Sequence, residues 1–590
     1  MHYVNINYIV SAHGEFIVNY VCFLEKNEIK IFNGPDSIKK FLEFVFAQGK
    51  KNTYVLSGDL LIESLLLIDY LYKKDLYFYE ILFFDLNVYN LKIFYNGCCI
   101  CFFCFSKLWP NSLKNISSIM SVDFFQKLSA LNLKKILTEN RFKLFLQNNE
   151  EFDNTFLGVR IILTLLQAYQ ILEKFFANYQ LSIIGNCIYS ASSFALKCFF
   201  KKFNNFNIRP SLKNNVDLFV REGYFGGRNE VFGNPDDGDH IYNYDFIGMY
   251  GQCMEEEFPI DEGGFEFNLT NTELPGFYDI TFNSIAMQIP VLPYRDKEFD
   301  KVMFCNGIMR GTYWFEEINL FLKKGGVILK IHAAYIFQKT ACVFKPFVQD
   351  IKNLKEKNEV FRKLGKIYIN SFYGRLAMRE KNLKTTLVGT QEEYSYWSLN
   401  EATTRMFKLN NIYVVEYNAY FLNKNQKKKK NLFKSNAIYA GIITAKARIK
   451  LYMSFEEVQN LNGIVLYCDT DGVFASFKNP ILLDIKNTKL GNKAIDDAVF
   501  ISPRAYAVKY KDMSEVVSKN HCAVNIVFDN LKQAFFNESA QNPALLGNIE
   551  STSTKNFLSN QNSKRVFLNL KKKTRAFFFY KGVFLYSTHI

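Results

Sequence analysis

Two aspartates, Asp469 and Asp471, stand in a tight Asp-Thr-Asp-Gly turn between two apolar runs, residues 464–468 and 473–477. Apolar runs on both sides of such a turn predict a β-hairpin with buried strands. Acidic residues at a hairpin tip are also common in ordinary solvated turns, which is the alternative interpretation. Buried strands would hold both carboxylates at the edge of a rigid sheet, where they could bind a cation.

A third acidic residue, Asp245, ends a separate strand-like segment, residues 240–245, which then opens into a helix. Carboxylates from two strands of one sheet provide the oxygen ligands that Mg²⁺ prefers, and Mg²⁺ is commonly shared with substrate phosphates. Two such ions can stabilise the attacking and the leaving oxygens of a phosphoryl transfer. If the strands belong to one sheet, the three aspartates could together form a metal centre for chemistry on phosphate esters.

A third segment is expected to form a helix with a basic stripe. The stripe residues are separated by four, four and three positions, which places them on one helical face. They are Arg362, Lys366, Asn370 and Tyr373. A basic stripe is usually the solvated side of a helix. Here an asparagine and a tyrosine are in register with the cations, and the stripe ends at Gly374, which favours contacts to a triphosphate and a base.

The elements that must position these residues follow from the surrounding sequence. Residues 1–200 have the pattern of alternating strands and helices, and the Asn-rich passage 203–215 has the composition of a linker. Beyond it turn-rich strands predominate, and helices are expected over residues 344–378 and 437–455. With 590 residues, the chain should hold more than one folding unit.

The overall charge points to a class of partner. Lys and Arg number 72 against 57 Asp and Glu, so the net charge is +15. This excess predicts a polyanionic partner, either nucleic acid or an acidic membrane. A basic organellar protein whose charge only aids solubility is the alternative. No apolar run approaches the length needed to span a bilayer.

Four cysteines cluster among phenylalanines. They are Cys98, Cys99, Cys101 and Cys104. No second cysteine or histidine pair partners them, and a zinc site needs four ligands that converge from polar loops. We therefore expect a buried apolar strand, because free cysteine behaves as a small hydrophobic residue.

The three chemistry-bearing segments resemble motifs A, B and C of family-B DNA polymerases. The resemblance is closest to the protein-primed branch of linear mitochondrial plasmids, phages and adenoviruses. Motif B of that branch, KxxxNSxYG, is matched fully by residues 366–374. Motif C, YxDTDS, is matched by residues 467–472, except that Gly472 stands in place of serine.

Three further elements of the branch occur in the same order as in the family. Motif A, DxxSLYP, is similar to residues 245–251, which keep the aspartate and the tyrosine but carry Gly248, Met249 and Gly251. The KxY element resembles residues 504–506, and the YxGG element resembles residues 224–227. Each match alone would be weak evidence for the family, whereas five matches in the family's order are specific for it.

The resemblance implies roles at the metal and nucleotide site. Asp245 and Asp471 would bind two Mg²⁺ ions, with Mn²⁺ as an alternative, and Asp469 would assist. Tyr250 would pack under the sugar and exclude a 2′-hydroxyl by size. The other residues implied in nucleotide binding are those of motif B and the preceding arginine: Lys366 and Arg362 at the triphosphate, and Asn370 and Tyr373 at the nascent base pair.

The resemblance also implies contacts to DNA. Arg504 and Tyr506 would hold the primer strand, and arginine in place of the family's lysine keeps the charge but changes its geometry. The YxGG segment would bind the template. Its residues are Tyr224, Gly226, Gly227 and the adjacent Arg228.

The N-terminal region departs from the family. There it is a 3′–5′ exonuclease with three acidic motifs, but the acidic positions correspond here to Asn5 and Asn7, to Ile62 and to Arg160. Neutral amides and an arginine cannot hold two Mg²⁺ ions. We expect an exonuclease-like fold without exonuclease activity; an unrelated domain over residues 1–200 is the alternative.

The resemblance implies an α/β multidomain fold, with an RNase H-like exonuclease-type domain followed by a right-hand polymerase of palm, fingers and thumb. The expected parts are the exonuclease-like domain at 1–202, a linker with the YxGG segment at 203–228, palm and fingers at 229–514 and a thumb-like region at 515–590. Two branch-specific insertions are expected at about 262–345 and 383–432. The second contains the Lys427–Lys430 run, either a solvated loop or a salt-sensitive phosphate contact.

The implied function is that of a DNA-directed DNA polymerase that extends a primer on a DNA template with dNTPs, without proofreading. A monomer working with a separate terminal priming protein is expected, in a mitochondrion or, alternatively, in a virus. The other hypothesis is a non-catalytic nucleic-acid-binding remnant. Random decay would not be expected to erase the exonuclease carboxylates while sparing the three polymerase carboxylates, which favours the enzyme.

Overall fold

The computed structural model divides the chain into two compact units, each with its own sheet. Unit 1 comprises Met1–Phe203, Asp350–Arg375 and Arg379–Phe433, and unit 2 comprises Asn204–Gln349, Leu376–Met378 and Lys434–Ile590. The structure describes residues 1–10, 16–25, 28–34, 36–58, 60–72, 78–84, 87–110, 154–209, 212–284, 287–296, 301–357, 359–378, 383–409, 412–418, 435–480, 488–490, 495–510, 513–518, 579–580 and 583–584. The Lys427–Lys430 run and nearly all of the expected thumb-like region lie outside these ranges.

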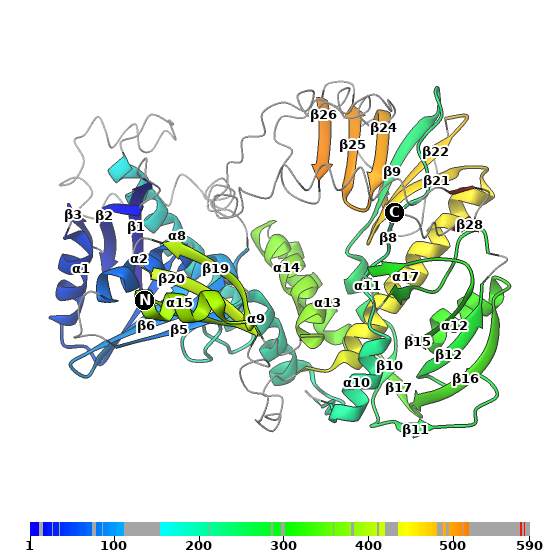
Figure 1. The fold of residues 1–590 in the computed structure, drawn as a ribbon, viewed down its shortest axis with the longest axis horizontal. Coiled ribbons are helices and arrows are strands. Elements are labelled where there is room, and N and C mark those ends of the chain that lie inside the picture. The colour runs from blue at the N-terminus through cyan, green and yellow to red at the C-terminus, as the bar shows by residue number, and fades with distance from the viewer. Residues whose placement is uncertain are drawn as a thin grey trace. The chain divides into compact units, whose positions relative to one another are not determined.

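Unit 1 is built on a seven-stranded sheet with the order β3-β2-β1-β4-β7-β6-β5 (Figure 1). Its strands are β1 (His2–Val10), β2 (Phe16–Glu25), β3 (Glu28–Asn33), β4 (Asn52–Ser57), β5 (Phe78–Phe84), β6 (Asn87–Tyr95) and β7 (Cys98–Cys104). β4 pairs in parallel with both β1 and β7. The cysteine cluster forms β7, in which Cys99, Cys101 and Cys104 are buried, so the prediction of a buried apolar strand is confirmed.

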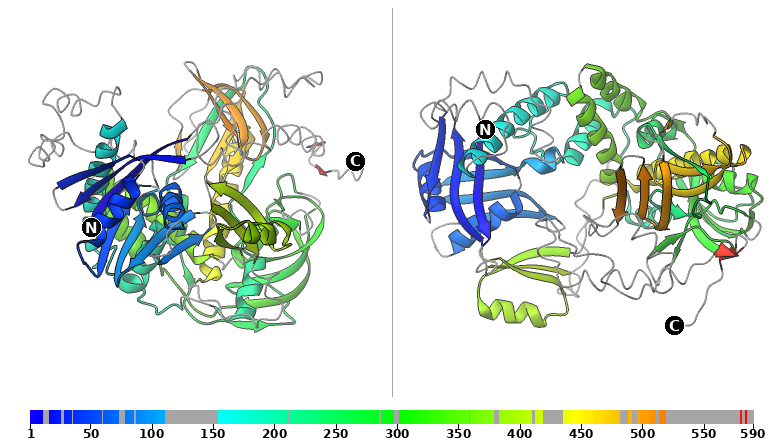
Figure 2. Two further views of the ribbon diagram at one scale, coloured as in Figure 1. Left: turned by 60° about the vertical axis from the view of Figure 1, so that its left-hand side comes forward. Right: turned by 90° about the horizontal axis from the view of Figure 1, so that it is seen from above.

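Three helices pack on this sheet, whose strands lie side by side in Figure 2. They are α1 (Ser37–Phe46), α2 (Leu60–Tyr72) and α8 (Asn154–Ala177). Apolar residues of α1 and α2 pack with those of the central strands in one hydrophobic core. Burial of such apolar surface is the main favourable term in folding.

The same core contains residues from far along the chain. Ile412 and Val414 are buried in it, and Leu387 packs against it. These residues belong to a three-stranded sheet of β18 (Leu383–Val388), β19 (Thr403–Leu409) and β20 (Ile412–Asn418), with helix α15 (Gln391–Leu399). The described part of the expected second insertion, up to Asn418, therefore belongs to unit 1.

Helix α14 (Glu359–Leu376), which carries motif B, follows α13 (Lys345–Lys357) and packs on unit 1 through aromatic residues. Tyr368 lies with its ring centroid 5.3 Å from that of Phe175 on α8, and 4.6 Å from that of Phe194 on α9 (Ala191–Cys198). Phe372 packs similarly on Phe199. This apolar face explains why the polar stripe of the same helix faces away from the core.

Unit 2 is built on an eight-stranded sheet with the order β26-β25-β24-β9-β22-β21-β8, in which β23 also pairs with β9. Its strands are β8 (Asn229–Val231), β9 (His240–Phe246), β21 (Ile464–Asp469), β22 (Gly472–Phe477), β23 (Thr488–Leu490), β24 (Ile495–Ser502), β25 (Ala505–Tyr510) and β26 (Met513–Ser518). The predicted hairpin is confirmed as β21 and β22. Helix α17 (Ala437–Asn460) packs against both strands (Figure 1).

A second sheet of unit 2 falls within the expected first insertion. It has the order β11-β16-β12-β15, and helix α12 (Phe315–Lys323) packs on it. Its strands are β11 (Gly264–Glu266), β12 (Gly276–Asn283), β15 (Ile308–Trp314) and β16 (Val327–Ile336). Two short helices, α10 (Asn214–Glu222) and α11 (Met249–Met254), complete the part of the unit that surrounds the site.

Of the helices in the described ranges, none is both long enough and apolar enough to cross a membrane.

Candidate functional site

The three aspartates lie at adjoining ends of β9, β21 and β22. Gly472, the first residue of β22, is paired with Asp245 on one side and with Asp469 on the other. Asp245 and Asp471 are exposed and Asp469 is half-buried, whereas the rest of the hairpin is almost wholly buried. The structure therefore brings the three carboxylate-bearing residues together at one edge of the sheet, as the resemblance implied.

Backbone hydrogen bonds define the turn between β21 and β22. The Phe246 amide donates to the Asp471 carbonyl at 2.7 Å, which ties the end of β9 to the turn. The Thr470 amide donates to the Arg228 carbonyl at 2.7 Å. Thr470 has a φ of 61°, a left-handed conformation that is strained for a β-branched residue. Such strain is maintained only where the surrounding structure enforces it.

Two glycines that depart from the family's motifs have a structural explanation. A Cβ atom on Gly472 would lie 2.8 Å from Oδ1 of Asp245, so glycine lets that carboxylate lie directly over the start of β22. Gly248 precedes α11 with a φ of 64°, a conformation that glycine adopts without strain. Glycine at position 472 thus leaves room for the Asp245 carboxylate, and glycine at position 248 permits the left-handed turn that begins α11.

The donor set at this edge fits hard divalent cations. Carboxylate oxygens are the ligands that Mg²⁺ prefers, and Mg²⁺ usually keeps several waters and takes one or two protein carboxylates plus substrate phosphates. In the described part of the chain, no three His, Cys, Asp or Glu side chains are grouped closely enough to hold a metal ion. The three aspartates, two of them exposed and one half-buried, supply carboxylate oxygens at this edge.

The YxGG segment lies directly against the turn between β21 and β22, called here the acidic turn (residues 469–472). A Cβ atom on Gly227 would lie 2.8 Å from Cγ2 and 3.0 Å from Oγ1 of Thr470. Gly226 is exposed, Tyr224 is half-buried, and no atom lies within 4 Å of a Cβ built on Gly226. The segment therefore contacts the turn through Gly227, while Gly226 faces open space.

Arg228 is placed differently from the expectation that it contacts DNA. Arg228 is only 2% exposed. Its guanidinium pairs with Glu230 at 2.6 Å and donates to the Pro290 carbonyl at 2.8 Å. The guanidinium also lies 4.0 Å from the ring centroid of Phe304. Burial raises the pKa of Glu230, against the opposing effect of Arg228. The side chain of Arg228 is thus part of the core, and this expectation is corrected.

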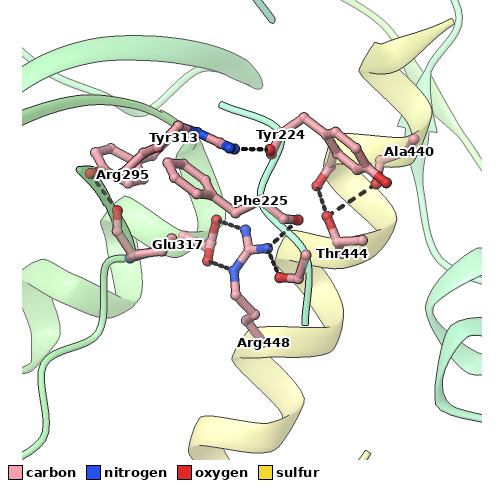
Figure 3. A network of polar contacts seen from close by, with 11 residues as sticks. Tyr224, Phe225, Arg295, Tyr313, Glu317, Ala440, Thr444 and Arg448 are labelled. Carbon is pink, nitrogen blue, oxygen red and sulfur yellow. Dashed lines mark hydrogen bonds and ion pairs between the residues drawn. The ribbon is translucent and has the colours of Figure 1, made fainter. Parts of the chain in front are cut away.

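A second buried arginine, Arg448 on α17, holds the YxGG segment in place. Its guanidinium forms a two-pronged ion pair with Glu317 of α12, at 2.8 and 2.6 Å, and donates to the carbonyls of Phe225 and Gly226, both at 2.8 Å (Figure 3). Arg295 donates to the Tyr224 carbonyl at 2.9 Å. Sequence reasoning missed this network, although an arginine within a largely apolar helix was a usable signal.

The primer-strand residues expected from KxY lie beside the acidic turn. Nε of Arg504 lies 3.8 Å from Oδ2 of Asp469, and the Arg504 amide donates to the Tyr467 hydroxyl at 3.0 Å. Tyr506 packs on Tyr467 with ring centroids 5.0 Å apart. The Tyr467 hydroxyl donates to Oδ1 of Asn229 at 3.0 Å, and burial raises the pKa of Tyr467.

The motif B residues share one face of α14, as predicted. Arg362, Lys366 and Asn370 are exposed and Tyr373 is half-buried. They belong to unit 1, whereas the aspartates belong to unit 2. Tyr250 is half-buried on α11, in the same unit as the aspartates.

The exonuclease-like positions on β1 lie in a polar cluster that includes the buried Glu63. Nδ2 of Asn5 donates to Glu63 at 3.5 Å, and Nδ2 of Asn19 donates to Oδ1 of Asn7 at 3.2 Å. Glu63 is buried and also accepts from the Ile6 amide at 3.0 Å and from the Ser57 hydroxyl. Its carboxylate is therefore engaged within the protein. Ile62 is half-buried beside it; Arg160 lies on α8, and its side chain is outside the described part of the chain.

We expect Gly227→Ala to destabilise the free protein by about 1–3 kcal/mol, because the added methyl group must displace Thr470 from a strained turn. Urea unfolding measures the effect. The matched control is Gly226→Ala, for which the change should stay within about 0.5 kcal/mol or be slightly stabilising. Equal destabilisation by the two variants would contradict the contact with Thr470.

Comparison with known proteins agrees with this arrangement. Residues 159–460 match the family described as DNA polymerase type B, organellar and viral. A probable DNA polymerase of Podospora anserina is 24% identical over 382 residues, which cover 58% of this chain and 31% of that protein. A probable DNA polymerase of Neurospora intermedia is 24% identical over 244 residues, which cover 38% of this chain and 25% of that protein. The chain thus spans less than a third of the length of these two relatives.

Solved structures show the same fold. Phi29 DNA polymerase complexed with primer-template DNA superposes with a TM-score of 0.65 at 15% identity, covering 90% of this chain and 94% of that one. Its ternary complex with incoming nucleotide substrates gives a TM-score of 0.66 at 14% identity, with the same coverage. This likeness confirms the expected fold class, an exonuclease-type domain followed by a right-hand polymerase. The chain belongs to the organellar and viral type B DNA polymerases.

Proposed function

We propose that the chain is a DNA-directed DNA polymerase that adds dNTPs to a primer 3′ end by two-metal nucleotidyl transfer. The observation that carries the proposal is the meeting of Asp245, Asp469 and Asp471 around Gly472 at one sheet edge. Bound Mg²⁺ at this edge would neutralise charge on the attacking and leaving oxygens. Asp245 and Asp471 would hold the ions, and Asp469 would assist.

The remaining residues would orient the substrates. Lys366 and Arg362 offer positive charge to the triphosphate, and Asn370 and Tyr373 shape the pocket of the nascent base pair. Tyr250 packs under the sugar and excludes a ribonucleotide by size. The residues proposed to hold DNA are Arg504 and Tyr506 for the primer, and Tyr224, Gly226 and Gly227 for the template.

The proposal extends to the absence of proofreading and to the biological setting. The engagement of Glu63, Asn5 and Asn7 in internal hydrogen bonds supports a domain that binds no catalytic Mg²⁺. The organellar and viral scope of the family, together with relatives from two fungi, supports protein-primed replication of linear DNA in mitochondria. A terminal priming protein would then be a partner of a monomeric polymerase.

The experiment that tests the proposal is extension of a 5′-labelled primer on a DNA template with dNTPs and either Mg²⁺ or Mn²⁺. We expect longer products, and no shortening of single-stranded DNA in a parallel nuclease assay. A folded protein that binds DNA in a mobility-shift assay but does not extend the primer with either ion would support the non-catalytic remnant. Rapid Mg²⁺-dependent degradation that Asn5→Ala abolishes would overturn the lack of proofreading.

A further inference from the structure

Lys446, on helix α17 of unit 2, is a buried cation that contacts two carboxylates of the same unit. Its side chain is only 5% exposed. Nζ donates to both carboxylate oxygens of Glu316, at the start of α12, at 2.7 Å, and to Oε2 of Glu256 at 3.0 Å. Lysine is almost never buried unless it is paired, so the two glutamates account for its place in the core.

A second lysine joins the same cluster. Lys450, one turn further along α17, pairs with the other oxygen of Glu256 at 2.7 Å. Burial lowers the pKa of Lys446, but Glu316 and Glu256 outweigh it, so the pKa is raised above the ordinary value of lysine. Burial likewise raises the pKa of Glu256, but Lys450 and Lys446 outweigh that effect and the pKa is lowered. Lys446 and Glu256 are therefore both charged at neutral pH.

Glu256 stands at the end of α11, the helix that carries Tyr250. The Glu256 amide donates to the Cys253 carbonyl at 3.3 Å, which attaches this residue to the last turn of the helix. Met249, Cys253 and Met254 are buried, and α11 packs on α17. Apolar burial is non-directional, whereas an ion pair joins two particular atoms. The contact with Lys446 therefore fixes where the end of α11 lies along α17.

The start of α11 is attached to the acidic turn. The Phe246 amide donates to the Asp471 carbonyl at 2.7 Å, and Nε2 of Gln252 donates to the Ile247 carbonyl at 2.9 Å, which joins the helix to the segment that leaves β9. The helix thus has two points of attachment, the acidic turn at its start and α17 at its end. Tyr250 lies between these points, in the same unit as the three aspartates.

We propose that Lys446 is a positioning residue that holds the end of α11 through Glu256, and thereby sets the position of Tyr250 relative to the three aspartates. Lys446 thus maintains the selection of dNTPs over ribonucleotides. The inference rests on the proposed function, because that function assigns Tyr250 to the exclusion of a 2′-hydroxyl. Exclusion by size depends on a distance, and misplacement by about 1 Å can alter a catalysed rate by as much as about 100-fold.

Single-nucleotide addition with dNTPs and with the corresponding rNTPs tests the inference. The discrimination is the ratio of the two kcat/KM values. We expect Glu256→Gln and Lys446→Met each to lower this ratio about tenfold, because α11 is then free to shift. Glu256 is partly exposed, so Glu256→Gln should fold like the wild type even if Lys446→Met does not. Lys446→Arg should retain most of the discrimination, since arginine keeps the charge.

The matched control is Glu316→Gln, which removes the other carboxylate of the same lysine. Glu316 belongs to α12, so its loss leaves the pair of Lys446 with Glu256 in place. We expect a lower urea midpoint than that of the wild type, but an unchanged ratio. A merely structural role of Lys446 would lower the ratio in this control as well.

A second test asks whether Lys446 acts through Tyr250. Tyr250→Ala should remove most of the discrimination, and adding Lys446→Met should then change the ratio by no more than about twofold. Hydrogen exchange of a peptide covering residues 247–258 gives a readout independent of catalysis. We expect faster exchange in Glu256→Gln and Lys446→Met, but not in Glu316→Gln.

The outcomes separate the two proposals. Unchanged exchange or an unchanged ratio in Glu256→Gln and Lys446→Met would overturn the role of Lys446. The same fall of the ratio in Glu316→Gln, or a further fall when Lys446→Met is added to Tyr250→Ala, would overturn it too. A wild-type protein without polymerase activity, or undiminished discrimination in Tyr250→Ala, would instead overturn the proposed function. The exchange measurement would still decide whether Lys446 holds α11.

Discussion

Asp245→Asn and Asp471→Asn should each lower the rate constant of nucleotide addition by about a thousandfold or more, equivalent to ~4 kcal/mol of transition-state stabilisation. Each substitution keeps the size of the side chain but removes the negative charge that would hold a divalent cation. Because both residues are exposed at the sheet edge, we expect no loss of stability. The effect should therefore appear in catalysis alone.

Single-turnover primer extension measures this loss, with DNA binding and thermal unfolding followed in parallel. The matched control is Asp279→Asn, an aspartate of the same unit that pairs with Arg310 on an exposed face of β12 and β15. Extension by the control should be close to that of the wild type. Near-normal extension by either site variant with Mg²⁺ would rule out the assigned metal ligands.

Glu317→Gln should destabilise the protein by about 3–5 kcal/mol, the usual result of breaking a buried ion pair from one side. The side chains of Arg448 and Glu317 are 3% and 2% exposed. The substitution would leave the buried guanidinium without a carboxylate, so its acceptors would all be neutral: the carbonyls of Phe225 and Gly226 and the amide oxygen of the glutamine. Template binding should weaken as well, because these carbonyls belong to the YxGG segment.

Urea unfolding compared with electrophoretic mobility shifts on primed DNA would detect both effects. The exposed pair Arg310–Asp279 provides the control, since Arg310→Met should cost less than about 1 kcal/mol. The double variant Glu317→Met with Arg448→Met should recover part of the stability, because no buried charge then lacks its partner. A change below about 1 kcal/mol in Glu317→Gln would contradict the importance of the pair.

The features that were predicted correctly are each specified by a short, continuous stretch of sequence. The hairpin around Asp469 and Asp471 follows from two apolar runs and a turn, and the exposed face of α14 follows from helical spacing. The position of Asp245 opposite Gly472 was reachable only through the resemblance, because strand pairing across more than 200 residues has no local signal.

The features that could not be predicted depend on partners distant in the chain. Arg228 looked like a surface cation beside the YxGG segment, but Pro290 and Phe304 enclose it. Nothing near Arg448 in sequence identifies Glu317 as its partner. For a charged residue, burial is decided by what folds over it, and local pattern does not contain that information.

The discontinuity of unit 1 has a consequence for synthesis on the ribosome. Its core is completed by Ile412 and Val414, so the sheet formed by the first 203 residues lacks part of its packing until translation has passed Phe433. At about 5–20 residues per second, the intervening 230 residues (433 − 203) take roughly 10 to 50 s to make. During that interval the nascent chain carries a sheet with incompletely covered apolar surface, the type of state that chaperones bind.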